Sequence, residues 1–90
     1  MTNKQLKLIY EYMGWNPKYV GFEKRLDSNS AWECVQEMER RGDWLEFSRN
    51  AWQDFGSIGV TYSQFILWLF NPDNFFTCFG KFLEVRNETI

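Results

Sequence analysis

Apolar residues recur along this 90-residue chain with the spacing of amphipathic helices. Steps of three and four residues place side chains on one face of a helix. Four such stripes follow one another: Leu6, Ile9, Tyr10 and Met13; then Ala31, Val35 and Met38; then Trp44, Phe47, Ala51 and Phe55; and finally Phe75, Phe76, Phe79, Phe82 and Leu83. A continuous apolar run from Phe65 to Phe70 adds a fifth segment. The pattern therefore predicts an all-α fold.

Helix-capping signals agree with this periodicity. A capping box pairs a Ser, Thr or Asp with a Glu or Gln three residues later, and both satisfy free N–H groups of the first turn. The box occurs at residues 2–5, 30–33, 43–46 and 61–64, and Asn71-Pro72 supplies a fifth helix start. Gly14, Gly42 and Gly56 follow three stripes, where a left-handed residue ends a helix. We predict one domain, residues 1–90, forming a compact array of about five short helices at approximately 3–13, 31–41, 44–55, 62–70 and 72–85.

One segment departs from the helical pattern. Residues 15–29, "WNPKYVGFEKRLDSN", contain a proline, a glycine and a short apolar alternation. Such a stretch is typical of an ordered loop or a short extended piece. The alternative fold is therefore α+β, with a short hairpin around 18–23 or 44–60.

The apolar run at Phe65–Phe70 is too short to span a membrane, because a spanning helix needs roughly 20 apolar residues. Asn71, Asp73 and Asn74 follow it directly. The run therefore predicts the body of a short helix, and no membrane partner is expected.

Candidate chemistry is sparse. The chain has no histidine, the usual general base at neutral pH and the commonest metal ligand. Glu33 and Glu37 lie one helical turn apart, but Glu37 also precedes Arg41 by four residues, which favours a solvated, ion-paired helix face. We expect no enzyme activity, no catalytic or metal-binding residues and no cofactor.

Two cysteines, Cys34 and Cys78, lie beside apolar stripes, where small core residues are expected. The polar N-terminal segment does not resemble a secretory signal, so a cytoplasmic chain with reduced thiols is expected. A disulfide between the two predicted helices is the alternative.

The charge pattern argues against general nucleic-acid binding. The net charge is −2, and residues 27–56 carry seven acidic and three basic groups. A phosphate backbone is bound by a strong basic surface, which this chain lacks.

Aromatic residues make up 20% of the chain, which is more than a small core readily holds. Tryptophan is enriched at the centres of protein interfaces, so Trp32, Trp52 and Trp68 are candidate anchors for a partner. The alternative is that all these rings are internal. Acidic residues of the predicted middle helices could face a basic partner surface; these are Glu33, Glu37, Glu39, Asp43 and Glu46.

Three segments carry a resemblance to other proteins: "YEYMGW" (10–15), "CVQEMERRGDW" (34–44) and "WLFNPDNFFTCFGKFLE" (68–84). They resemble segments of short uncharacterised proteins encoded by phages and prophages of gut bacteria. The resemblance implies no catalytic residues. It implies a setting, the cytoplasm of a bacterial host, in which small acidic phage proteins often bind host proteins, including nucleases of host defence.

The sequence therefore predicts a non-enzymatic protein-binding module of phage or mobile-element origin. The alternative is a small self-associating structural protein, a homodimer closed by its surplus aromatic face. A nucleic-acid or small-ligand binder is the least favoured class.

Overall fold

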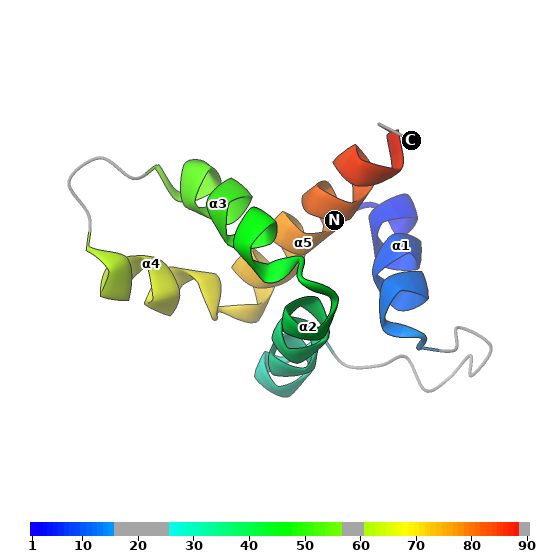
Figure 1. Ribbon diagram of the computed structural model, residues 1–90, viewed down its shortest axis with the longest axis horizontal. Helices are drawn as coiled ribbons and strands as arrows, with labels where there is room; N and C mark the ends of the chain where they lie inside the picture. The colour runs from blue at the N-terminus through cyan, green and yellow to red at the C-terminus, as the bar shows by residue number, and fades with distance from the viewer. Residues whose placement is uncertain (16–25, 57–60, 89–90) are drawn as a thin grey trace.

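The computed structural model describes residues 1–15, 26–56 and 61–88, and within these ranges all regular structure is helical. Figure 1 shows the five helices of these ranges. In chain order they are α1 (Asn3–Met13), α2 (Ser28–Arg41), α3 (Trp44–Phe55), α4 (Tyr62–Leu69) and α5 (Pro72–Glu88). The predicted all-α array of about five helices is confirmed.

Two predicted capping boxes are formed. The Thr2 hydroxyl accepts a hydrogen bond from the Gln5 backbone N–H at 3.1 Å, and the Gln5 Oε1 accepts one from the Thr2 N–H at 3.0 Å. Thr61 and Gln64 make the same reciprocal pair at the start of α4. These bonds satisfy N–H groups that have no partner within the helix, so each box fixes where its helix begins.

The predicted start of the second helix at residue 31 is wrong by almost one turn. The α2 helix begins at Ser28, and the carboxylate of Asp27 accepts a hydrogen bond from the Ser30 N–H at 2.9 Å. Asp27 therefore takes the capping position that the sequence pattern gave to Ser30. The earlier start places Ser30 and Ala31 inside the helix, where both are buried.

The predicted capping box at Asp43 is also wrong. Asp43 precedes α3, but its side chain makes no capping hydrogen bond. Its carboxylate instead accepts a hydrogen bond from the Tyr12 hydroxyl and pairs with Arg86. Asp43 has a helical backbone conformation (φ −94°, ψ −12°), whereas an N-cap residue is typically extended, and its ion pair with Arg86 adds a charged partner that a cap does not have.

The last helix starts as predicted and ends later. The Asn71 Oδ1 accepts a hydrogen bond from the Asp73 N–H at 3.0 Å, and α5 runs from Pro72 to Glu88, beyond the predicted end at residue 85. The preceding helix α4 ends at Leu69, one residue before its predicted end.

The hairpin alternative is wrong for residues 44–55, which form α3. Residues 18–23, and the part of 44–60 from 57 onward, lie outside the described residues. Within the irregular segment predicted at 15–29, Ser28 and Asn29 are helical.

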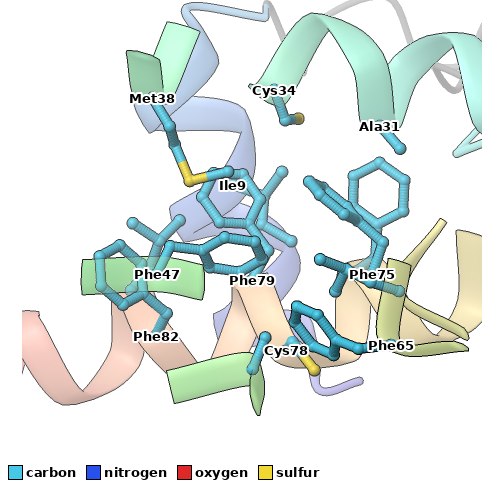
Figure 2. Packing of buried hydrophobic residues seen from close by; sticks show 14 residues of the cluster. Ile9, Ala31, Cys34, Met38, Phe47, Phe65, Phe75, Cys78, Phe79 and Phe82 are labelled. Carbon is cyan, nitrogen blue, oxygen red and sulfur yellow. The ribbon is translucent and has the colours of Figure 1, made fainter. Parts of the chain in front are cut away.

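The α5 helix is the centre of the fold, because it packs against each of the other four helices. The predicted stripe of α5 is fully buried. The ring of Phe47 on α3 lies 5.4–5.7 Å from those of Phe75, Phe79 and Phe82 on α5. Figure 2 shows these rings with Ile9, Ala31 and Met38 from α1 and α2 around them. Edge-on and tilted aromatic contacts of this kind form the core.

Both cysteines belong to this core, as their positions beside the stripes predict. Cys34 and Cys78 are both buried, and no disulfide joins them. Burial raises the pKa of the Cys78 thiol to about 11, with a further contribution from the charge of Asp54. A group in this state is a packing residue rather than a nucleophile.

The α3 and α4 helices lie together at the end of the molecule opposite α1 (Figure 1). None of the helices in the described ranges is long and apolar enough to cross a membrane.

Candidate functional site

The three candidate tryptophans occupy different environments. Trp32 on α2 is 55% exposed, and its ring centroid lies 6.4 Å from that of Phe70. Trp52 on α3 and Trp68 on α4 are partly buried against the core. The structure therefore brings two of the candidates to the α3–α4 end of the fold and leaves the third on α2.

Trp52 and Trp68 belong to one set of contacting rings. We call this set, Trp52, Phe55, Phe65 and Trp68, the α3–α4 aromatic cluster. Phe65 is buried at its centre, and the Trp52 ring meets it edge-on at a centroid distance of 4.9 Å. Phe55 contacts both Phe65 and Trp68, at 5.7 and 5.1 Å. The cluster joins α3 to α4, and its three outer rings are partly buried.

An open groove of about 360 Å³ runs over this cluster. The described residues that line it are Ser48, Arg49, Trp52, Gln53, Tyr62 and Phe65, and we call it the α3–α4 groove. Tyr62 stands at one wall with 66% of its surface exposed, and its ring lies 6.1 Å from that of Phe65. The groove thus presents aromatic side chains for contact with a ligand.

One charged residue, Arg49, is among the described residues that line the α3–α4 groove. The α4 helix carries no charged residue. The carboxylates of Glu46 and Asp54 on α3 are exposed and are not among the described lining residues. The charge that the described lining offers to a partner is therefore positive.

The five acidic residues predicted to face a partner lie in different environments. Glu37 accepts hydrogen bonds from both Arg40 and Arg41, which lower its pKa to about 2, and Asp43 is engaged by Tyr12 and Arg86. The other three predicted acidic residues, Glu33, Glu39 and Glu46, are exposed. The acidic candidates thus lie on several surfaces rather than on one.

A second group of polar residues joins three parts of the chain. The Tyr12 hydroxyl of α1 donates to Asp43 Oδ2 at 2.7 Å, and Arg86 Nη1 of α5 lies 2.9 Å from the same oxygen. Arg41 Nη2 donates to the Tyr12 carbonyl oxygen at 2.6 Å, and its guanidinium lies 4.0 Å from the centroid of the Tyr12 ring. We call these residues, Tyr12, Arg41, Asp43 and Arg86, the Tyr12–Asp43 cluster.

The ionisation of the Tyr12–Asp43 cluster follows from these contacts. Burial opposes the ionised form of Asp43, but hydrogen bonds from Tyr12 and Arg86 outweigh it and lower the pKa of this carboxyl. Burial, then the hydrogen bond to Asp43, raises the pKa of Tyr12. Each charge already faces a partner within the protein, so the cluster holds helices together and is not arranged for proton transfer.

Five of the six described groove residues, Ser48, Arg49, Gln53, Tyr62 and Phe65, were not among the predicted site residues. The sequence holds a signal for part of this face. Leu45 and Trp52, seven residues apart, lie on one side of α3 and give it a second apolar edge, with the polar Ser48 between them and Arg49 beside it. That second edge, distinct from the core stripe, is the signal that indicates a binding face.

No group of three or more potential metal-ligating side chains occurs in the described part of the chain. Comparison with known protein families, curated proteins and solved structures finds no match to this chain. The residues described above are therefore the basis for assigning a function.

Proposed function

We propose that this chain is a non-enzymatic protein-binding module and that a partner protein docks in the α3–α4 groove. The observation that carries the proposal is the open groove itself, in which the rings of Trp52 and Tyr62 lie against buried Phe65. Rings of this kind supply large contact areas at a low entropic cost, and they are enriched where partners bind most strongly.

Exposed apolar side chains of α4 support this assignment. Phe65 belongs to the core and Trp52 packs against it, but Tyr62 and Leu67 are mostly exposed, at 66% and 78%. Exposed apolar side chains gathered at one end of a small domain are typical of an interaction site.

The proposal includes an origin and a location. The three segments that resemble phage and prophage proteins support a phage or mobile element as the source. The partner is then a host or phage protein, with a nuclease of host defence as one candidate, and the module works in the cytoplasm of a bacterial host. No disulfide joins Cys34 to Cys78, which suits a reducing compartment.

A comparative capture experiment tests the proposed function. The tagged wild-type protein, Tyr62→Ala and Val85→Ala are used as bait in a bacterial lysate, and bound proteins are quantified by mass spectrometry. Val85 on α5 is a matched control, because it is 59% exposed and does not line the groove.

We expect one or more proteins to bind wild type and Val85→Ala equally and to be depleted with Tyr62→Ala. Equal binding by all three baits would show that the groove is not the docking surface. Circular dichroism of each variant establishes that the bait is folded.

A further inference from the structure

We propose that the segment held in the α3–α4 groove is an acidic amphipathic helix, whose apolar side chains cover Trp52 and Tyr62 and whose carboxylate pairs with Arg49. This inference rests on the proposed function and specifies the partner's chemistry. The carrying observation is the described lining of the groove, in which Arg49 is the charged residue and lies with the rings of Trp52 and Tyr62.

Arg49 determines what can cover the groove. It is exposed, and it forms no ion pair with another described residue. A purely apolar partner would take its guanidinium out of water without a compensating charge, which is strongly unfavourable. A Glu or Asp on the partner removes this cost and accepts two parallel hydrogen bonds from the planar guanidinium.

The shape of the surface favours a helix as the occupant. Leu45 is exposed and lies one turn before Arg49, so the edge of α3 beside the groove runs from Trp52 past the polar Ser48 to Leu45, which is outside the described lining. This edge is about 10 Å long at a rise of about 1.5 Å per residue, which matches two turns of a partner helix. A helix with apolar residues at steps of three and four fits such an edge.

A second copy of this chain does not satisfy the groove. In a two-fold interface the same patch contributes from both sides. The described lining residues include Arg49 and no carboxylate, so groove-to-groove pairing would bring two guanidinium groups together without an acceptor. The charge pattern therefore selects a different, acidic partner surface.

A peptide series tests this inference directly. Three synthetic peptides, stapled to hold a helix, carry the same leucines at steps of three and four and differ only in flanking residues, which are glutamate, glutamine or lysine. Each is titrated into the full-length protein, with affinity measured by calorimetry and the binding site by NMR amide shifts. The protein variants are Arg49→Glu and the control Lys7→Glu, an exposed position on α1 with the same change in net charge.

We expect the glutamate peptide to bind wild type about tenfold more tightly than the lysine peptide, as one charge-assisted pair provides. Amide shifts should centre on Ser48, Trp52 and Gln53. Arg49→Glu should reverse the preference, and Lys7→Glu should leave it unchanged. Absence of binding, equal binding by the glutamate and lysine peptides, or a preference that survives Arg49→Glu would overturn the inference. So would groove shifts that appear on concentrating the protein alone, which would indicate a second copy.

The two proposals fail in different ways. If capture depends on Tyr62 but the peptides show no dependence on Arg49, the docking site stands and the acidic helix is wrong. If capture is independent of Tyr62, the proposed function fails whatever the peptides show.

Discussion

A Cβ atom added at Gly80 would lie 3.0 Å from the Cβ of Gln5, closer than two such atoms normally pack. Gly80 is buried on α5, and Gln5 is held on α1 by the capping box with Thr2. Gly80 therefore sets how closely the first and last helices approach each other.

Gly80→Ala should destabilise the protein by about 1 kcal/mol. Alanine favours a helix over glycine by about 1 kcal/mol, but overpacking typically costs about 1–3 kcal/mol, and the Gln5 Cβ moves only with the backbone of α1. Urea unfolding measures the difference. Thr77→Ala, at an exposed position of α5, is the control for helix propensity. A stabilised Gly80→Ala variant would show that α1 shifts without cost.

The hydroxyl of Tyr12 should stabilise the fold through Asp43. Tyr12→Phe removes this 2.7 Å hydrogen bond and keeps the ring, which meets Phe79 edge-on at 5.4 Å. Loss of a hydrogen bond to a charged group costs about 1.5–3 kcal/mol, so we expect a loss of about 2 kcal/mol in chemical denaturation. Tyr62→Phe, at an exposed tyrosine, should change stability by less than about 0.5 kcal/mol. Equal stability of the two variants would contradict the role of Tyr12.

Acid should weaken the same cluster. Because the pKa of Asp43 is lowered in the folded state, its contribution is complete above the pKa of the unfolded chain, about 4. This contribution is lost as the pH falls through the lower pKa of the folded state. Glu37, with a pKa of about 2, titrates in the same direction but is solvent-screened.

We therefore expect the midpoint of thermal unfolding to decrease between about pH 5 and pH 2. Asp43→Asn should be less stable at neutral pH and should show a shallower acid slope. Glu39→Gln, at an exposed carboxylate of α2, is the matched control. An unchanged acid slope in Asp43→Asn would mean that other carboxylates control acid unfolding.

Substitution of a core ring should reduce stability, whereas substitution of a groove ring should mainly reduce partner binding. Phe47→Ala should cost about 3–5 kcal/mol of stability, because Phe47 is fully buried among three rings of α5. Trp52→Ala should keep the fold, lose about 1 kcal/mol with its contact to Phe65, and lose about 2 kcal/mol or more of partner binding. Unfolding of Trp52→Ala would assign this ring to the core.

Much of the fold follows from local signals in the sequence. The Thr2 and Thr61 capping boxes are each formed by two residues three positions apart. The stripe from Phe75 to Leu83 is recognised from apolar residues repeating with the period of a helix. Neither signal requires knowledge of the tertiary structure. Asp27 and Ser30 are both good caps within one turn. The choice between them depends on which start buries Ala31, which is a tertiary effect.

The candidate site was less predictable because it depends on distant contacts. The sequence pattern predicts Asp43 as a helix cap, whereas its carboxylate binds the distant residues Tyr12 and Arg86. Phe55 and Trp68 meet only because α3 and α4 pack side by side. The groove face of α3 is recognised only when Arg49 and Trp52 are found to line one groove with Tyr62 of α4.

The central claim is that the α3–α4 groove receives a partner protein, and site-specific photo-cross-linking tests it most directly. A photoreactive residue replaces Gln53 in the groove or, as a control, Lys7 on α1, and each protein is irradiated in a bacterial lysate. We predict a discrete adduct with a protein other than this chain from position 53, which is lost when Tyr62→Ala is added and absent from position 7. The claim would be contradicted by equal adducts from both positions, by adducts only between copies of this chain, or by no adduct at position 53.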